Sequence, residues 1–430
     1  AKDVLFYRSR NLLRMLLKAL FRNNPLMIMH LKMQERRWSR KITEAKDFFI
    51  RRKALSRKRR FSEQGINVWG YLTGELGMGE GARANVRCLQ SAGIPFVLLN
   101  IDNHSPSRKD DTTFKDFSLT NPHGINLLHV NADMFGRIYA EKGRNFFSGK
   151  YNIAFWTWEL NEFPDQWLSS FDYCDEIWVP SSFVHDAIAQ KSPVPVLRVP
   201  HAVEPDRLTG SVVRLPGVEK NGEFLFLFMF DFFSYFQRKN PLAVIRAFQK
   251  AFPRQDKVRL VIKCINSCFD PLAFKALQEA GRICPVTIID QYFNREQIQG
   301  RFRLCDCYVS LHRSEGFGLT IAEAMSWGKP VIATGYSGNM DFMNINNSYP
   351  VKYELVSVKE DAGPYRKGSV WAEPDISHAA ELMRFVYEHP DKAQEIGGRA
   401  SAFIRDHYNC LRIGAAIKER VEYIYQNRRA

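Results

Sequence analysis

Residues 309–331 read VSLHRSEGFGLTIAEAMSWGKPV, and this stretch decides the fold class. It begins within an apolar strand expected over 308–311, and a helix is expected from near Phe317. The loop between them carries serine and glycine, which favour turns. A strand, a short loop and a helix in this order form the unit from which parallel α/β sheets are built. Such sheets hold ligands at the carboxyl ends of their strands.

Two carboxylates stand eight positions apart in this stretch. Glu315 lies in the strand-to-helix turn, and Glu323 lies about two helical turns further along, on a similar side of the helix. Gly316 and Gly318 allow the backbone to approach a bound group closely, because glycine has no Cβ atom. The pattern indicates a ligand site at the start of the helix.

Two series of apolar strands alternate with helical segments along the chain. The first series is expected at 66–72, 95–101, 125–130, 152–158, 176–181 and 195–200. The second is expected at 224–230, 259–264, 285–290, 307–312 and 330–334, with helices at 241–252, 271–281, 294–302 and 319–326. Because strands that alternate with helices favour parallel sheets, the sequence predicts two doubly wound, Rossmann-like α/β domains in tandem.

The composition is that of a globular chain. Its 430 residues are 45% hydrophobic, which allows two sizeable domains and an extension. Eight cysteines occur without a CxxC pair, which favours a reduced, cytoplasmic protein. Cys264, Cys268, Cys305 and Cys307 lie in or beside apolar runs and are expected to be buried thiols. No signal peptide and no uncharged apolar run long enough to span a bilayer is visible.

The positive charge is concentrated at the N-terminus. Residues 1–60 hold 19 of the 61 Lys and Arg but only 4 of the 46 Asp and Glu, a net charge of +15. Residues 61–430 hold 42 of each kind and are formally neutral. Within the extension, residues 8–22 (RSRNLLRMLLKALFR) have helical periodicity with one broad leucine face, and a second basic block covers 36–60.

Three interpretations of this extension remain open. A basic amphipathic helix suits the surface of an anionic bilayer, where it would hold the protein peripherally at the inner face of the cytoplasmic membrane. A charged helical connector would instead pack on this chain or on a neighbouring domain, as in a piece of a longer protein, and the sequence does not begin with Met. Nucleic acid is not expected as a partner, because no basic groove with interleaved aromatic residues is indicated.

The segment Glu315-Gly-Phe-Gly-Leu-Thr-Ile-Ala-Glu323, followed by GKPVIAT at 328–334, resembles the E-x7-E signature of GT4-type retaining GT-B glycosyltransferases. The resemblance covers roughly residues 66–425. It implies two Rossmann-like domains that face each other across a cleft. The implied divisions are a basic helical extension (1–60), an acceptor domain (61–205), a nucleotide-sugar donor domain (206–405) and a helix that crosses back to the first domain (406–430).

The same resemblance assigns the donor phosphates to two loops. The glycine-rich turn GELGMGEG at 74–81 would lie over the diphosphate, with Gly77 and Gly79 as its phosphate contacts. After the first strand of the second domain, Arg238 and Lys239 would neutralise the leaving group as catalytic cations.

One position in this loop departs from the family pattern. Asp231 stands near where the family carries an arginine, and the two cations at 238 and 239 are adjacent rather than a few residues apart. Lys263, on the next expected strand, is a further donor-binding candidate.

The resemblance also assigns roles within the central motif. Glu323 would accept hydrogen bonds from the nucleotide ribose, and Glu315 would lie against the sugar ring as a catalytic carboxylate. Phe317, Gly318 and Leu319 would offer backbone N–H groups to the phosphate and the sugar.

Trp158 and Glu159 come at the end of a strand of the first domain. We expect them on the acceptor side, with core packing of the tryptophan and a plain surface role for the glutamate as the alternatives. His201, in the connector between the domains, is expected to be structural.

No Asp-x-Asp motif follows a strand and no His/Asp cluster has metal-ligand spacing, so neither a metal nor another cofactor is expected. The resemblance implies a metal-independent, retaining transfer of a hexose from a nucleotide-diphosphate sugar to a glycan or lipid-linked acceptor. Assembly of surface polysaccharide or lipopolysaccharide would be the setting. The alternatives are a GT-B enzyme of another reaction, such as an epimerase or a glycogen-type synthase, and a catalytically degenerate module that binds glycan or a partner glycosyltransferase.

Overall fold

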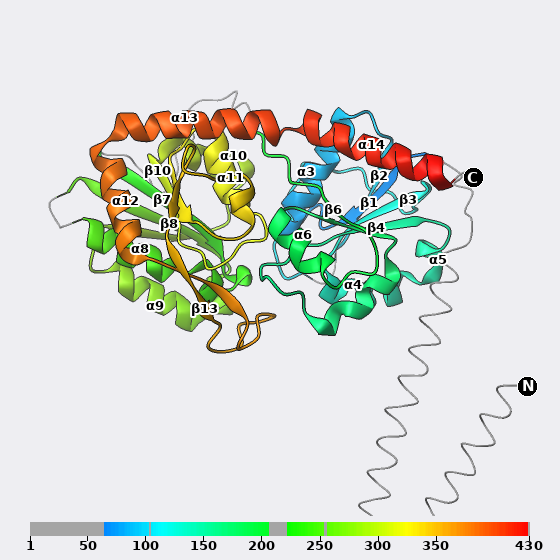
Figure 1. Ribbon diagram of the computed structural model, residues 1–430, viewed down its shortest axis with the longest axis horizontal. Coiled ribbons are helices and arrows are strands. Elements are labelled where there is room, and N and C mark those ends of the chain that lie inside the picture. The colour runs from blue at the N-terminus through cyan, green and yellow to red at the C-terminus, as the bar shows by residue number, and fades with distance from the viewer. Residues whose placement is uncertain (1–63, 103–104, 206–221, 253–255, 429–430) are drawn as a thin grey trace, which may run out of the picture. The chain divides into compact units, whose positions relative to one another are not determined.

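Two parallel sheets follow one another along the chain, as the sequence predicts (Figure 1). Each has six strands, whereas the sequence predicts six for the first and five for the second. The structure is a computed structural model that describes residues 64–102, 105–205, 222–252 and 256–428. The basic segments predicted within residues 1–60 lie outside the described residues. Residues 58–430 form one packed unit, which contains both sheets.

The first sheet has the strand order β2-β1-β3-β4-β5-β6. Its strands are β1 (Ile66–Gly70), β2 (Phe96–Asn100), β3 (Ile125–His129), β4 (Tyr151–Phe155), β5 (Glu176–Val179) and β6 (Val196–Arg198). The connecting helices are α3 (Gly77–Ser91), α4 (Ala132–Lys142), α5 (Arg144–Phe147), the 3-10 helix η1 (Asp165–Tyr173) and α6 (Ser182–Ala189).

The second sheet has the strand order β12-β11-β10-β7-β8-β9. Its strands are β7 (Phe224–Asp231), β8 (Val258–Ile265), β9 (Val286–Asp290), β10 (Cys307–Ser310), β11 (Val331–Thr334) and β12 (Tyr349–Val351). The helices up to β12 are α7 (Phe236–Lys239), α8 (Pro241–Ala251), α9 (Pro271–Gly281), α10 (Arg295–Leu304) and α11 (Leu319–Ser326), with 3-10 turns η2 (Phe232–Ser234), η3 (Ser267–Phe269) and η4 (Gly338–Asp341).

Strand β7 shows why its sheet is buried on both faces. Phe226, Phe228 and Phe230 point to one face and pack in the core beneath α8 and α12 (Ile376–Glu388). The alternate residues Leu225 and Leu227 point to the other face and pack in the core with α11. A continuous apolar run is what a central strand between two helical layers requires.

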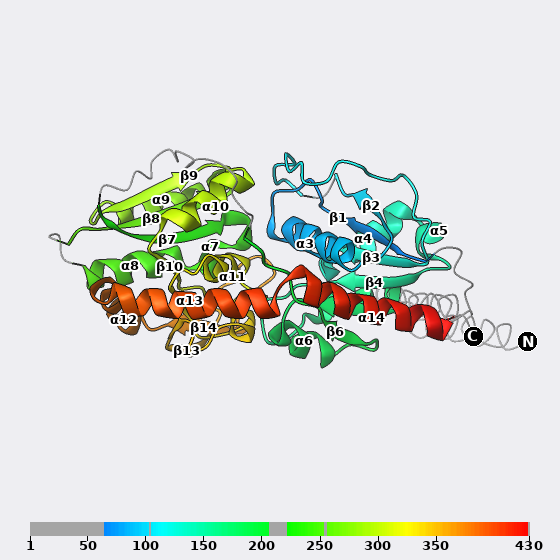
Figure 2. The same ribbon diagram turned by 90° about the horizontal axis from the view of Figure 1, so that it is seen from above.

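The chain ends in two long helices, α13 (Pro390–His407) and α14 (Cys410–Arg428). Figure 2 shows α13 running along the second domain and α14 along the first. Helix α14 contributes Ile413, Ile417 and Val421 to the core that also holds β1 and α3. The hydroxyl of Tyr425 donates a hydrogen bond to Gly65 O at 2.7 Å, which fastens the C-terminal helix to the start of the first sheet.

Most expected elements are confirmed within one or two residues. The helix of the central motif spans Leu319–Ser326, as expected from the helical series, and it starts two residues after the alternative start near Phe317, because Gly318 precedes it with a φ of +92°. Strand β12 and the antiparallel hairpin of β13 (Tyr353–Ser357) and β14 (Val370–Pro374) were not predicted. The prediction of buried thiols is correct for three cysteines and wrong for Cys268, which is exposed.

Helix α14 approaches α3 so closely that Gly414 tolerates no side chain. A Cβ atom there would lie 2.4 Å from Cys88 O, whereas a Cβ atom on Gly398 of α13 would meet nothing within 4 Å. We expect Gly414→Ala to destabilise the protein by about 1–3 kcal/mol through overpacking. Gly398→Ala should be neutral or stabilise it by up to ~1 kcal/mol, as alanine does in an open helix. Urea unfolding of both variants measures the change in the free energy of unfolding. Equal changes for Gly414→Ala and Gly398→Ala would contradict the prediction.

Candidate active site

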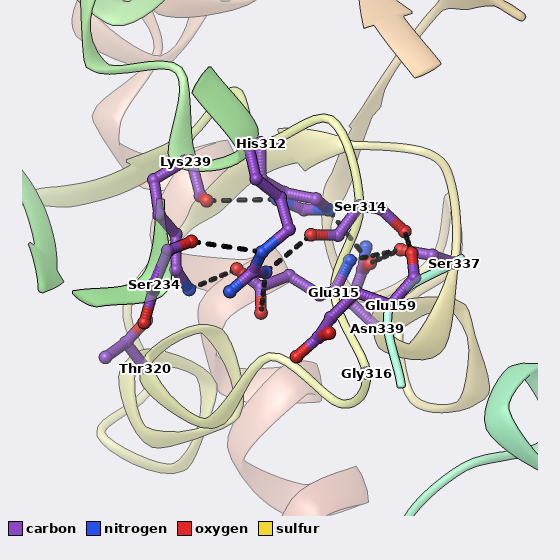
Figure 3. A network of polar contacts seen from close by, with 12 residues as sticks. Glu159, Ser234, Lys239, His312, Ser314, Glu315, Gly316, Thr320, Ser337 and Asn339 are labelled. Carbon is purple, nitrogen blue, oxygen red and sulfur yellow. Dashed lines mark hydrogen bonds and ion pairs between the residues drawn. The ribbon is translucent and has the colours of Figure 1, made fainter. Parts of the chain in front are cut away.

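The side chain of Glu315, in the loop between β10 and α11, forms the centre of the candidate site. It is only 8% exposed. Arg238 Nη1 lies 3.2 Å from Glu315 Oε2, and Lys239 Nζ forms an ion pair with Glu315 Oε1. We call these residues the Glu315 triad, and Figure 3 shows Lys239 and Glu315 within one polar network. The structure thus brings together the three residues that the sequence analysis assigns to catalysis.

Burial and ion pairing act in opposite directions on this carboxylate. Burial alone would raise the pKa of Glu315, but the charges of Lys239 and Arg238 outweigh it and hold the pKa at about 2. Burial lowers the pKa of Lys239, and the charge of Glu315 opposes that change. Glu315 is therefore ionised at neutral pH, so it can accept hydrogen bonds but cannot donate a proton.

The loop after β7 supplies both cations. At the end of this strand, Asp231 Oδ1 accepts hydrogen bonds from Phe233 N at 3.0 Å and from Asn266 Nδ2 at 2.8 Å. The residue that replaces the expected arginine thus shapes the turn, and helix α7 then presents the two cations.

Arg238 joins the loop after β7 to the loop after β10. Its Nε donates to Ser234 O at 3.2 Å, and its Nη1 donates to Ser314 O at 2.8 Å. In return, Arg313 N donates to Arg238 O at 2.8 Å. The triad is therefore held by main-chain contacts as well as by charge.

Backbone strain is concentrated in the loops around the site. Among the described residues, the non-glycine residues with positive φ are Tyr235, Asn240, Asn266 and Ser337. All four follow strands β7, β8 or β11. Such backbone persists only where the surroundings impose it, and it is typical of ligand sites.

The loop after β11 supports Glu315 from behind. Glu315 N donates to Ser337 Oγ at 2.8 Å, and Gly338 N donates to Glu315 O at 2.9 Å. A Cβ atom on Gly338 would lie 2.2 Å from Gly316 O, so only glycine allows this approach. The motif turn is thus fixed on two sides.

His312, just before the motif turn, is fully buried and serves as a support for the loop. Its Nδ1 lies 3.0 Å from Ser310 Oγ and its Nε2 lies 3.0 Å from Asn339 Oδ1. Burial lowers the pKa of His312 to about 4, so the ring is neutral at pH 7.

The motif turn and the loop after β11 also contact the first domain. Ser181 Oγ donates to Gly316 O at 2.6 Å, and Ser314 Oγ donates to Glu159 O. Asp341 Oδ2 accepts from Ser182 N at 2.9 Å and pairs with Arg198 Nη1 at 2.8 Å. These contacts join the two domains at the triad. Sequence reasoning missed Ser181 because a side chain that binds main-chain oxygen leaves no motif.

The acceptor-side candidates lie at this junction. Tyr365, in the β13–β14 hairpin loop, donates from its hydroxyl to Glu159 Oε2 at 2.9 Å, and its ring lies 5.9 Å from the Arg238 guanidinium. Trp158 is 3% exposed, and its ring lies 5.6 Å from that of Tyr365 and 5.0 Å from that of Trp167. Trp158 therefore packs in an aromatic cluster, while Glu159 comes close to the triad through Tyr365.

The glycines of the first βα turn have different surroundings. A Cβ atom on Gly77, where α3 begins, would meet nothing within 4 Å, so this position is open. A Cβ atom on Gly79 would lie 2.4 Å from Gly74 O, and one on Gly81 would lie 2.6 Å from the His201 ring. Close packing alone thus requires glycine at positions 79 and 81, and the His201 ring packs against Gly81. Gly77, in contrast, leaves room for a ligand.

The start of α11 carries the remaining donor-binding candidates. Phe317 packs its ring in the core below the motif, and Gly318 precedes the helix. Ile321 N and Ala322 N both donate to Gly318 O at 3.0 Å, so the N–H groups of Leu319 and Thr320 are the ones that a helix start leaves for a ligand. Glu323 lies half-buried one turn into the helix. Glu315 and Glu323 both raise the pKa of Tyr308, after the larger effect of burial, which places both carboxylates near one phenol.

Lys263, on β8, makes no contact with the triad among the described residues. It lies instead beside Arg301 of α10, a residue that sequence reasoning missed. An arginine in a helix with basic neighbours is usually exposed, so the sequence contains no signal of its burial.

Two searches of the described residues gave no match. No group of three or more His, Cys, Asp or Glu residues there is arranged to hold a metal ion. None of the helices in the same part of the chain has the length and apolar character needed to cross a membrane.

Comparison with protein families gives one match, over residues 218–402, to the family model described as glycosyl transferases group 1. The matched residues make up less than half of this chain. Trehalose synthase from Pyrococcus horikoshii is 23% identical over 171 residues, 38% of this chain and 36% of that protein. Trehalose synthase from Thermococcus litoralis is 23% identical over 176 residues, 40% of this chain and 38% of that protein. The matches thus span well under half of these relatives.

Solved structures resemble both domains together. Sucrose-phosphate synthase from Thermosynechococcus elongatus has a TM-score of 0.61 at 13% identity, over 85% of this chain and 100% of that one. A glycosyltransferase from Rickettsia africae has a TM-score of 0.60 at 14% identity, with the same shares. HepE from Anabaena, in complex with UDP and glucose, has a TM-score of 0.56 at 14% identity, over 84% and 100%. The predicted GT-B fold is confirmed, and the family match supports a glycosyltransferase.

The ionised state of Glu315 makes a prediction about acid stability. Its folded pKa of about 2 lies below the ordinary 4.5, so its contribution is present above pH 4.5 and is lost as the pH falls toward 2. At pH 7, Glu315→Gln should cost about 3–5 kcal/mol, because it leaves two buried cations without their counter-ion. Urea unfolding between pH 7 and 2.5 should show this difference shrinking below pH 4.5. A difference that stays constant would contradict the buried ion pairs.

Proposed function

We propose that this protein is a GT4-type retaining glycosyltransferase that moves a hexose from a nucleotide-diphosphate sugar to a glycan or lipid-linked acceptor without a metal ion. The observation that carries the proposal is the Glu315 triad, a carboxylate that is ionised at neutral pH and held between two cations at the junction of two Rossmann-like domains. A site with fixed charges of both signs suits a reaction in which a glycosidic bond breaks into a positive sugar centre and a negative phosphate.

The charges suggest how the chemistry would proceed. The pKa of Glu315, about 2, leaves no proton to donate at neutral pH, so this carboxylate would accept hydrogen bonds from sugar hydroxyls and stabilise positive charge at the ring. Arg238 and Lys239 would hold the charge of the departing diphosphate. The leaving phosphate would take the proton of the acceptor hydroxyl on the same face, so no enzyme nucleophile is required.

The remaining donor contacts are those that the resemblance to GT4-type glycosyltransferases implies. Glu323 would bind the ribose, and the N-termini of α3 and α11 would offer N–H groups to the phosphates. HepE, whose fold this chain shares, is described in complex with UDP-glucose, which makes this sugar nucleotide the first donor to test. The acceptor would approach from the side of Glu159 and Tyr365, since their hydrogen-bonded pair borders the triad.

A binding-only module is the second candidate. It is favoured by Asp231, which shapes a turn near where the family carries an arginine, and by the pairing of both triad cations with Glu315. Such a module would bind nucleotide or glycan without turnover.

Donor hydrolysis separates the two candidates. We expect slow release of one nucleotide when UDP-, GDP-, dTDP- and ADP-sugars are offered in turn, measured by chromatography of the products. Glu323→Ala should reduce the rate by about 10²-fold or more if the ribose contact orients the donor. Glu381→Ala, an exposed glutamate on α12, is the matched control and should leave the rate unchanged.

A folded enzyme that binds nucleotide but turns over no donor, even with a membrane extract as the source of acceptor, would favour the binding-only module. Hydrolysis that survives Glu323→Ala would remove this residue from the donor site.

The basic extension would place the enzyme at the inner face of the cytoplasmic membrane, where lipid-linked acceptors for surface polysaccharide or lipopolysaccharide are assembled. Replacing Arg14, Lys18 and Arg22 together by Gln should reduce flotation of the full chain with anionic vesicles, because each basic residue near the surface contributes about 1 kcal/mol. Neutral vesicles are the control. Equal flotation of both proteins with anionic vesicles would count against membrane docking and favour a connector.

A further inference from the structure

Arg301 is the most completely unpaired charge in the described part of the chain. Its side chain lies on α10 and is 1% exposed. None of its three guanidinium nitrogens has a hydrogen-bond partner among the described residues. The guanidinium instead makes a cation–π contact, with its carbon 3.8 Å from the centroid of the Phe293 ring. Burial lowers the pKa of Arg301 to about 10, so the group stays charged at neutral pH.

Lys263 is a second buried cation at the same place. It is 7% exposed, and its Nζ lies 5.5 Å from the centroid of the Phe293 ring, so Arg301 and Lys263 contact one aromatic side chain. We call them the Arg301 pair. Burial, and then the charge of Arg301, lowers the pKa of Lys263 to about 8. Two buried like charges thus lie against one aromatic ring.

The nearest carboxylates do not neutralise this pair. Asp231 and Glu75 favour the charged form of Lys263 electrostatically, but within the described ranges neither forms an ion pair with it. Asp231 is occupied by its turn hydrogen bonds, and Glu75 by hydrogen bonds from Arg108. The pair therefore carries two positive charges without a counter-ion.

A purely structural role does not account for the free-energy cost of burying the Arg301 charge. A cation–π contact contributes up to about 2 kcal/mol when desolvated. Taking an ion out of water costs several kcal/mol unless a partner of opposite charge replaces the water. An arginine cannot lose its proton to escape this penalty. A group that binds from outside the chain is the partner that would offset it.

The position of the pair indicates what that group is. Lys263 lies near the carboxyl end of β8, on the edge of the sheet where parallel α/β folds bind ligands. Burial raises the pKa of Asp231, at the end of β7, and the charges of Lys263 and Lys239 both oppose that change, so this carboxylate interacts electrostatically with one cation of each group. The triad retains one net positive charge and the pair retains two, so the missing charge is negative.

We propose that Arg301 and Lys263 bind the phosphate-class anion of the donor nucleotide and are specificity-determining residues of the donor site. This proposal rests on the proposed function, in which the donor is a nucleotide-diphosphate sugar. The planar guanidinium matches two phosphate oxygens at once, and the ammonium adds a point charge. The diphosphate would thus be held by the Arg301 pair as well as by the cations of the triad.

Binding of inorganic pyrophosphate, UDP and uridine to the full chain tests this by titration calorimetry. Arg301→Leu and Lys263→Met should each weaken pyrophosphate and UDP by about 10-fold or more, the loss expected for one charged hydrogen bond, and leave uridine unchanged. Arg303→Leu, an exposed arginine on the same helix, is the matched control and should bind all three as the wild type does.

Thermal unfolding without ligand gives a second readout. Because Arg301→Leu removes a buried charge that has no partner, its melting temperature should equal or exceed that of the wild type, whereas loss of a structural arginine would lower it. If Arg301→Leu fails to fold, Arg301 has a structural role and the proposal is overturned for it, while Lys263→Met tests the lysine.

Variants that bind pyrophosphate and UDP as tightly as the wild type would overturn the proposal, and so would a wild type that binds neither. A loss confined to UDP would also overturn it, in favour of recognition of the base. Failure of the proposed function is distinct from all of these, because it would appear as nucleotide binding without turnover.

Discussion

The structure around the site depends on keeping Glu315 charged while it is buried. A carboxylate that is 8% exposed stays ionised only if cations lie beside it, and this requirement brings the loops after β7 and β10 together. The backbone of these loops is strained: Tyr235 and Asn240 take positive φ on either side of α7, and Ser337 does so behind the motif turn. These residues with positive φ thus lie in the two loops that supply and support the triad.

The junction of the two domains follows from the same turn. Glu315 is positioned by a loop whose main-chain oxygen at Gly316 accepts from Ser181, and whose Ser314 donates to Glu159 O. A Cβ atom on Gly316 would lie 3.2 Å from Trp158 O, so glycine is what lets the second domain come this close to the first. The domains thus meet at the loop that holds Glu315.

The sheets were predictable from the sequence because their signals are local, and the sequence also singles out Glu315, Arg238 and Lys239, although not the ion pairs among them. The apolar run of β7 marks a central strand, and the spacing of Glu315 and Glu323 marks a familiar motif. The β13–β14 hairpin gave no such signal, since β13 is mostly exposed and its residues follow no clear alternation. Tyr365, which this hairpin brings to Glu159, could be found only once the chain had folded.

Arg301 marks the deeper limit of sequence reasoning. Helix α10 contains three arginines, at positions 295, 301 and 303, and the composition of the helix does not reveal which of them is buried. Residues 61–430 are neutral as a whole, yet the Glu315 triad and the Arg301 pair together hold four cations and one carboxylate, and Asp231, at the end of β7, is a further carboxylate that interacts with them. Charge enclosed by a low-dielectric core acts far more strongly on a ligand than the same charge in solvent. The anion binding proposed for this site would therefore arise from where the cations are buried and not from the net charge of residues 61–430.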